Sequence, residues 1–175
     1  YQGRLLAYVQ ATGEEGTIRI HCSSPLLEGA TAEVEMTLPR EKGTIASGKL
    51  WPDNSGEHIN AHGGGVLYHN GTYYWYGEHK SPTTSSALVG VMCYSSKNLT
   101  DWTNEGAVMK VSEDPQSDIV KGCVIERPKV IYNAKTKKFV MWFHLELRGR
   151  GYEAARAAVA VSDSPTGPFE FVKSG

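Results

Sequence analysis

The sequence lacks the features that mark several large classes of protein. No apolar run approaches the roughly 20 residues that cross a bilayer. The net charge of −1 gives no electrostatic reason to expect nucleic acid or an anionic membrane as a partner. The three cysteines, Cys22, Cys93 and Cys123, have no CxxC spacing, so buried free thiols are expected rather than zinc or disulfides. The opening YQGRLLAYVQ lacks the parts of a signal peptide, and we expect it to lie inside a domain.

What the sequence does contain is strand after strand. Its 175 residues are 40% hydrophobic and 21% charged, which fits one ordinary domain or two partial ones. The helix-friendly stretch 151–161, GYEAARAAVAV, ends in β-branched residues and a turn, so a strand is expected there too. The pattern predicts an all-β chain. The expected strands are 4–11, 16–23, 30–37, 64–70, 72–79, 88–95, 127–133, 137–144, 157–163 and 169–174.

The composition divides the chain into three parts. Residues 39–54 are polar and rich in Gly, Pro and Ser, which is typical of a linker. Residues 1–38 are too few to fold alone, since domains of about 40 residues or fewer need additional support. We therefore expect 1–38 to be the last strands of a β-sandwich, and 55–175 to be a second β domain. One irregular all-β domain with the early strands at its edge is the alternative.

An internal repeat gives the architecture of the second part. The stretch 66–79, VLYHNGTYYWYGEH, aligns with 130–144, VIYNAKTKKFVMWFH, and 89–106 aligns with 157–175 in the same order. Each unit holds four short strands, which is the composition of a β-propeller blade. The chain carries about two such blades, whereas propellers need roughly four to eight. The sequence thus predicts a partial propeller.

Three motifs resemble the first half of the five-bladed propeller of glycoside hydrolase family 43. They are INAHGGGVLYHNGTYYWYGEHK, CVIERPKVIYN and GYEAARAAVAVSDSPTGPF, and their order and spacing are similar to those of the exo-β-1,3-galactanase branch. The stretch GRLLAYVQATGEEGTIRIHCSSPLLEGATAEVEM is similar, more weakly, to the end of the immunoglobulin-like sandwich of family 2 β-galactosidases. The fold class expected is therefore all-β: a partial five-bladed β-propeller preceded by the last strands of a β-sandwich.

The family resemblance implies inverting glycoside hydrolysis, which needs an acid and a base about 6.5–9.5 Å apart. Most family members place an aspartate base at the start of the first blade, where this sequence has Ala61, His62 and Gly63. The exo-β-1,3-galactanase branch shares that absence, and its amide base and glutamate acid lie beyond Gly175. No catalytic residue is therefore assigned within this chain, and the chain alone is expected to be inactive.

The same resemblance implies sugar contacts for Glu78, Glu126 and Tyr152. A charge within the apolar run VIERPKV is rarely buried without a partner, and alternation along a strand keeps Arg127 from pairing with Glu126. Three consecutive glycines, with Gly64 at the centre, indicate backbone passing close to the propeller axis where the sugar binds. His62 is expected to fix this glycine loop through hydrogen bonds. Trp75, Trp102 and Trp142 are expected to pack within the blades.

The expected function is thus part of an exo-β-1,3-galactanase or β-galactosidase acting on plant-type galactans. Two alternatives stay open: another family 43 specificity, such as α-L-arabinofuranosidase or β-xylosidase, and a non-catalytic carbohydrate-binding fragment. The expected partners are an oligo- or polysaccharide and the remaining blades. No cofactor is expected, although the resemblance leaves room for a structural calcium ion at the axis. The family implies a periplasmic or secreted location.

Overall fold

The computed structural model describes residues 16–25, 27–36, 43–45 and 47–175. The chain divides into two compact units, 1–42 and 43–175. All regular structure in the described residues is β-strand, as predicted, and these residues include no helix that could cross a membrane. The stretch 151–161, which had some helical character in sequence, turns and then enters a strand.

The described part of the first unit is one antiparallel hairpin. It pairs β1 (Gly16–Ser24) with β2 (Leu27–Met36), and Ile18 lies opposite Val34 in the register. These are two of the three strands predicted here, and the third, 4–11, lies outside the described residues. A two-stranded hairpin is marginal in water by itself, so the assignment of 1–38 to a β-sandwich stays a prediction. Cys22 on β1 is exposed, so its predicted burial is wrong, whereas Cys93 and Cys123 are buried free thiols.

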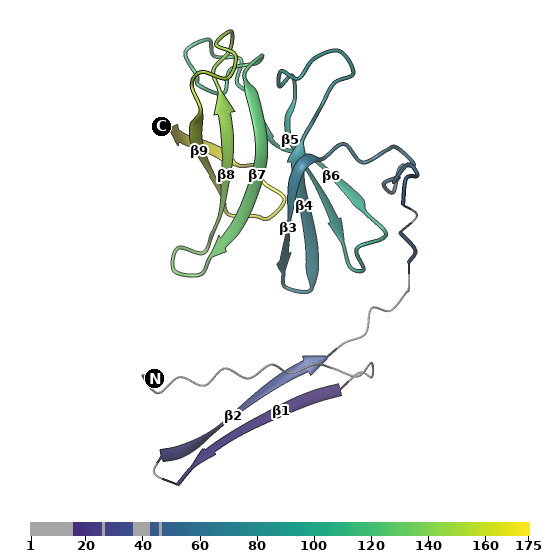
Figure 1. The fold of residues 1–175 in the computed structure, drawn as a ribbon, viewed down its shortest axis with the longest axis vertical. Coiled ribbons are helices and arrows are strands. Elements are labelled where there is room, and N and C mark those ends of the chain that lie inside the picture. The colour runs from purple at the N-terminus through teal and green to yellow at the C-terminus, as the bar shows by residue number, and fades with distance from the viewer. Residues whose placement is uncertain (1–15, 26, 37–42, 46) are drawn as a thin grey trace. The chain divides into compact units, whose positions relative to one another are not determined.

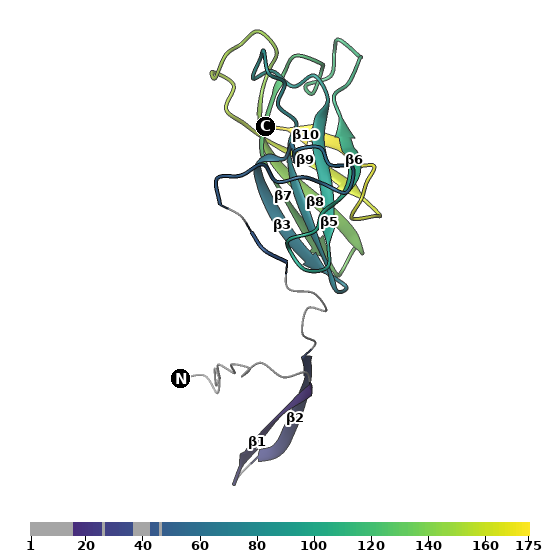
Figure 2. The ribbon, with the colours of Figure 1, turned by 90° about the vertical axis from the view of Figure 1, so that its right-hand side faces the viewer.

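The second unit consists of two four-stranded antiparallel sheets that lie side by side (Figures 1 and 2). The first, here called blade 1, has the order β3 (His62–His69), β4 (Thr72–Glu78), β5 (Gly90–Ser96), β6 (Thr103–Lys110). Blade 2 has the order β7 (Val124–Asn133), β8 (Lys138–Glu146), β9 (Arg156–Ser162), β10 (Glu170–Ser174). The predicted pair of meandering blades, with 64–70 and 127–133 in equivalent strands, is confirmed.

The turn between β3 and β4 shows how local sequence sets the register. Asn70 and Gly71 both have positive φ, 49° and 74°. This is the requirement of a two-residue type I′ hairpin, which Asn-Gly satisfies with little strain. The turn places His69 opposite Thr72, and every later pair of β3 and β4 follows from it until a bulge between His62 and Gly65.

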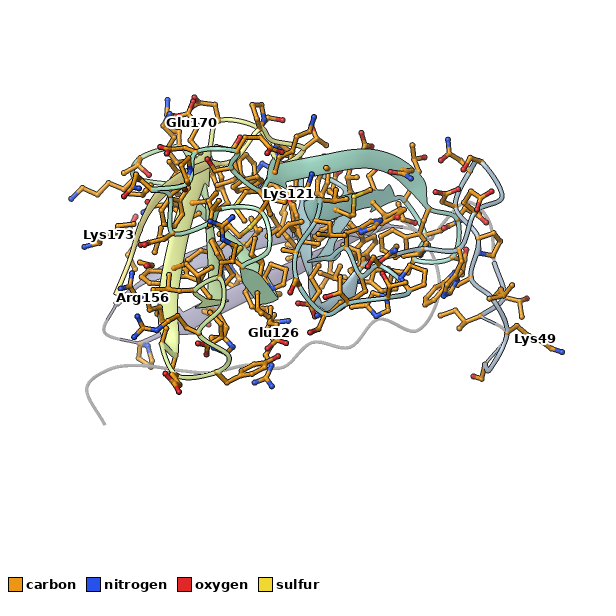
Figure 3. The ribbon with its side chains drawn as sticks, turned by 90° about the horizontal axis from the view of Figure 1, so that it is seen from above. Lys49, Lys121, Glu126, Arg156, Glu170 and Lys173 are labelled. Atoms are coloured by element: carbon orange, nitrogen blue, oxygen red, sulfur yellow. The ribbon has the colours of Figure 1, made fainter. Side chains whose placement is uncertain are left out.

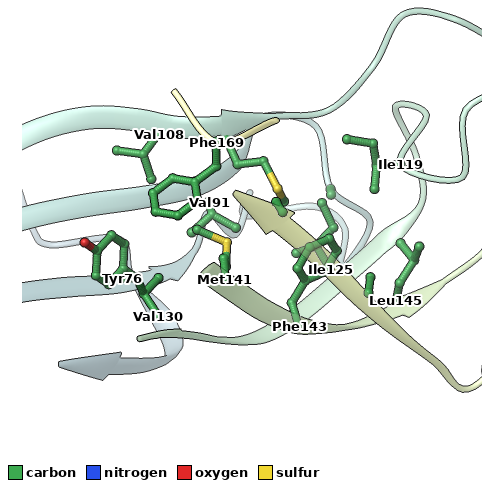
Figure 4. Close-up of a cluster of buried hydrophobic side chains, with 14 of the residues drawn as sticks. Tyr76, Val91, Val108, Ile119, Ile125, Val130, Met141, Phe143, Leu145 and Phe169 are labelled. Atoms are coloured by element: carbon green, nitrogen blue, oxygen red, sulfur yellow. The ribbon is translucent and has the colours of Figure 1, made fainter. Parts of the chain in front are cut away.

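The main core lies between the two blades (Figure 4). Tyr76 and Val91 of blade 1 are fully buried against blade 2, where Met141 is also fully buried. The Tyr76 hydroxyl donates to the carbonyl of Pro165 at 2.6 Å, and the Phe169 N–H donates to the Val108 carbonyl at 2.7 Å. The two blades are therefore joined both by apolar packing and by hydrogen bonds to backbone carbonyls.

A second, smaller core covers the opposite face of blade 1. Trp102 is buried there, as predicted, and Trp51 packs against Trp75 with ring centroids 5.4 Å apart. Part of the predicted linker 39–54 lies outside the described residues. Its last residues pack on the blade instead of spanning solvent, since the buried Asp53 accepts hydrogen bonds from Ser55 and Asn104.

Trp142 contradicts its predicted role in blade packing. Its side chain is 49% exposed and stands on the face of blade 2 that points away from blade 1. On β8 the residues alternate, so Met141 and Phe143 fill the core between the blades while Trp142 faces outward.

Candidate substrate-binding site

The candidate site forms where the inner two strands of each blade end. In blade 1, His62 lies opposite Glu78, and in blade 2, Glu126 lies opposite His144. In each inner strand a bulge follows directly, at Gly63 in blade 1 and at Arg127 in blade 2. Figure 3 shows Glu126 from above, near the place where the two blades meet.

Lys80 connects the two predicted carboxylates across the blades. Its Nζ lies 3.6 Å from Glu78 Oε2 and 3.9 Å from Glu126 Oε1. The backbone of Lys80 is fixed by Asn60, which donates to its carbonyl at 2.9 Å and accepts from its N–H at 2.8 Å. The ammonium group is therefore held between two acids from different blades, although neither contact is a close one. Arg127 forms no ion pair with Glu126 in the described residues, as predicted.

Glu78 is the more enclosed of the two predicted acids. Its side chain is 9% exposed, and Oε2 has no hydrogen-bond partner among the described residues. Burial raises the pKa of Glu78, and the charge of Glu126 raises it further, while Lys80 acts in the opposite direction. A buried polar atom without a hydrogen-bond partner is costly, and the charge of Lys80, with Nζ 3.6 Å away, compensates Oε2 only in part.

Glu126 is contacted on both oxygens. The Tyr152 hydroxyl donates to Oε1 at 2.6 Å, and His144 Nδ1 lies 3.4 Å from Oε2. The hydrogen bond to Glu126 raises the pKa of Tyr152, because the phenol donates only while it is protonated. The structure thus brings three predicted residues, Glu78, Glu126 and Tyr152, to one place.

His62 and Gly64 lie at the edge of this group. The His62 side chain is exposed and makes no hydrogen bond in the part of the chain described, so its expected role in fixing the glycine loop is wrong. Burial by its surroundings lowers the pKa of His62, and the charge of Lys80 lowers it further. Gly64 has no space for a side chain, since a Cβ would stand 2.1 Å from the Tyr76 carbonyl oxygen.

Each glycine of the stretch lies close to a neighbouring group, and the role of Gly64 in sugar binding stays a prediction. A Cβ on Gly63 would lie 2.9 Å from Glu78 Oε1, and one on Gly65 would lie 2.7 Å from the Lys129 side chain. Lys129 donates from Nζ to the Gly64 carbonyl, which ties the stretch to blade 2. Of the three glycines, only Gly63 adjoins the acids of the candidate site.

Three further residues of the site were missed from sequence: Lys80, His144 and Glu146. Glu146 is almost fully buried and lies 2.6 Å from His144 Nε2. Glu146 comes two residues after His144 on β8, so the two side chains lie on the same side of that strand, whereas Lys80 follows the end of β4. Alternation along β8 could therefore have pointed to Glu146, but not to Lys80.

The site contains hydrogen-bond donors as well as carboxylates. Among the described residues, no group of three or more His, Cys, Asp or Glu could hold one. The carboxylates are paired with Lys80, His144 and Tyr152, and accepting oxygens alternate with N–H and O–H donors. Such an arrangement can bind several hydroxyl groups of one sugar ring in fixed directions.

Comparison with known proteins places these features in a family. No family model and no curated protein matches the sequence. Among solved structures, a β-1,3-galactosidase of glycoside hydrolase family 43 with galactodeoxynojirimycin matches 75% of this chain and 38% of its own, at 61% identity and a TM-score of 0.74. An exo-β-1,3-galactanase from Phanerochaete chrysosporium with galactose matches 75% of this chain and 30% of its own, at 37% identity and 0.68.

A third similar structure is an exo-β-1,3-galactanase from Clostridium thermocellum, at 47% identity and a TM-score of 0.65 over 74% of this chain. This chain spans only 27 to 38% of the length of the three. The identities are high enough, and the fold similar enough, to confirm the resemblance drawn from the three sequence motifs. The matched part of the chain therefore belongs to glycoside hydrolase family 43, as a portion of the propeller of its exo-β-1,3-galactanase branch.

Proposed function

We propose that the site binds the terminal galactose of a β-1,3-linked galactan within a larger glycoside hydrolase. In this proposal the described blades form one wall of the pocket, and the remaining blades supply the rest. The hydrolysis would proceed with inversion, as the family resemblance implies. A periplasmic or secreted location, where such polysaccharides occur, is part of the same proposal.

One observation carries the proposal: Glu78, Glu126 and Tyr152 come together from two blades, and Glu78 Oε2 has no hydrogen-bond partner among the described residues. A galactose ring offers several hydroxyls that donate to carboxylates. The similar structures are named as β-1,3-galactosidases or exo-β-1,3-galactanases, and two of them contain galactose or a galactose-like iminosugar. These names support galactose as the bound sugar, and the cluster of Glu78, Glu126 and Tyr152 supports the place where it binds.

The acid and base are proposed to lie on blades outside this chain. Glu126 is held by Tyr152 and by His144, which suits a binding residue more than a group that transfers protons. A longer protein that carries this chain should hydrolyse an aryl β-galactoside faster than an aryl α-L-arabinofuranoside. The reverse preference would favour another family 43 specificity, and absence of turnover by the longer protein would favour a non-catalytic role.

The decisive experiment replaces Glu126 by Gln in the longer protein. A charge-assisted hydrogen bond is worth about 1.5–3 kcal/mol, so kcat/KM on a β-1,3-galacto-oligosaccharide should fall roughly ten- to 150-fold. Glu78→Gln should cause a similar loss. The exposed Glu153 is the matched control, and Glu153→Gln should leave kcat/KM unchanged. Normal activity of a normally folded Glu126→Gln variant would show that the pocket lies elsewhere.

A further inference from the structure

Glu146 is a buried carboxylate whose partners are all in or near the site. Its side chain is 1% exposed. The Ala154 N–H donates to Oε2 at 2.9 Å, and the Ala155 N–H donates to Oε1 and Oε2 at 3.1 and 3.0 Å. Burial alone would raise the pKa of Glu146, but these hydrogen bonds and the one with His144 together lower it. The structure therefore holds a charged carboxylate beneath the sugar-binding residues.

The first effect of Glu146 is on the turn before β9. Ala155 has a positive φ of 45°, which an alanine adopts only at a cost and only where its surroundings enforce it. The two N–H groups that Glu146 binds belong to this strained residue and to its neighbour Ala154. The same turn carries Tyr152, whose side chain is 60% exposed and whose hydroxyl contacts Glu126. Glu146 thus fixes one end of the turn that brings the phenol to Glu126.

The second effect is on His144. Its Nε2 lies 2.6 Å from Glu146 Oε1, and its Nδ1 lies 3.4 Å from Glu126 Oε2. An imidazole bound at one nitrogen by a buried carboxylate is fixed in orientation, as in other carboxylate–histidine pairs. Each oxygen of Glu126 therefore contacts a group whose position depends on Glu146: Oε1 through Tyr152 and Oε2 through His144.

We propose that Glu146 and His144 are positioning residues that hold Glu126 and Tyr152 in the geometry needed to bind the terminal sugar. This inference rests on the proposed function, because it assigns a role within the same site. Neither residue needs to touch the sugar. The buried carboxylate orients the imidazole and the turn, and these two fix the Glu126 carboxylate from both sides.

The test is a double-mutant cycle in the longer protein, with kcat/KM on a β-1,3-galacto-oligosaccharide as the readout. Glu146→Gln keeps one accepting oxygen but turns an NH2 group toward an N–H donor, so the turn and the imidazole lose their fixed positions. We expect roughly a tenfold loss of kcat/KM in the wild-type background, within the range of coupled neighbours. In the Glu126→Gln background, the same change should cost less than about threefold, since the residue that it positions has already been impaired.

His144→Gln gives a second cycle should Glu146→Gln fail to fold. The glutamine amide can replace Nε2 in donating to Glu146, but it has no group in the place of Nδ1. We therefore expect a near-normal melting temperature, a several-fold loss of kcat/KM, and little further loss when Glu126 is already Gln. Glu170, an exposed carboxylate on β10, is the matched control. Glu170→Gln should change nothing in either background.

The cycle distinguishes the positioning role of Glu146 and His144 from the sugar site itself. Suppose that Glu126→Gln lowers kcat/KM, but Glu146→Gln or His144→Gln causes the same fold-loss in the Glu126→Gln background as in the wild-type background. The positioning role is then wrong, and the proposed sugar site remains. Loss of stability alone would produce that independent behaviour. If Glu126→Gln itself has no effect, the proposed sugar site is wrong, and the positioning role is overturned with it.

Discussion

The two blades share one plan but differ in what covers them. Tyr76 on β4 and Trp142 on β8 occupy equivalent positions, each four residues after the strand pair that closes the turn, His69–Thr72 and Asn133–Lys138. Tyr76 is fully buried because blade 2 lies against it, whereas Trp142 is 49% exposed. A large aromatic at the same place in the repeat is thus core in one blade and surface in the other. We propose that the face of blade 2 around Trp142 packs against a further blade in a longer protein.

The two blades also differ in which of their inner two strands carries the acid and which carries the histidine. Across the inner strands, blade 1 pairs His62 with Glu78, and blade 2 pairs Glu126 with His144. The acid therefore stands on the second strand in blade 1 and on the first strand in blade 2. Equivalent backbone positions need not carry equivalent roles: of the two histidines, only His144 is hydrogen-bonded within the described residues.

The comparison between Tyr76 and Trp142 predicts the largest stability effect. In this 175-residue chain, Tyr76→Ala should lower the free energy of unfolding by about 3–5 kcal/mol, as expected for a large buried aromatic. Trp142→Ala should stay within about 0.5 kcal/mol, as for an exposed side chain. Urea denaturation of both variants measures the two changes. Equal losses would show that the outward face of blade 2 is already covered in this chain.

The stability losses of the same two variants can also be compared in a longer protein that carries further blades. There, Trp142→Ala should become as destabilising as Tyr76→Ala, because the next blade would bury the ring. The isolated chain, with this apolar face uncovered, should associate at high concentration, and Trp142→Lys should reduce that association. Light scattering against concentration measures it, and a strictly monomeric wild-type chain would count against an open blade face.

The fold could be predicted from sequence, and the site only in part. Alternating strands, the Asn70-Gly71 turn and the repeat are local signals, so they determine strands and their order without knowledge of the packing. Glu78 and Glu126 were found because family motifs contain them. Lys80, His144 and Glu146 escaped notice, because their roles depend on contacts between strands. Whether Trp142 is buried or exposed depends on what packs against blade 2, and the repeat alone does not show that.

The bulges of the two inner strands predict a smaller effect. Gly63 and Arg127 are equivalent, and their φ angles are nearly the same, 56° and 55°. Gly63→Ala should cost about 1–2 kcal/mol in backbone strain, and its Cβ would also crowd Glu78 Oε1. Arg127→Gly relieves strain of this size but gives the unfolded chain more freedom, so the net change should stay within about 1 kcal/mol. Thermal melting of the two variants compares them, and an unaffected Gly63→Ala would show that this bulge tolerates a side chain.

The smallest effect concerns Glu78 and depends on pH. Burial, the largest cause, raises its pKa above the ordinary value of 4.5. The folded state therefore holds the Glu78 proton more tightly than the unfolded state, and stability falls as the pH rises from about 4.5 through the folded pKa. Glu78→Gln removes this titration. The variant should melt close to wild type at pH 4 and above it at pH 7, while sugar binding is lost. Melting temperatures across this range measure the difference. A variant that melts below wild type at pH 7 would mean that Lys80 outweighs burial, and that Glu78 forms a stabilising ion pair in the folded state.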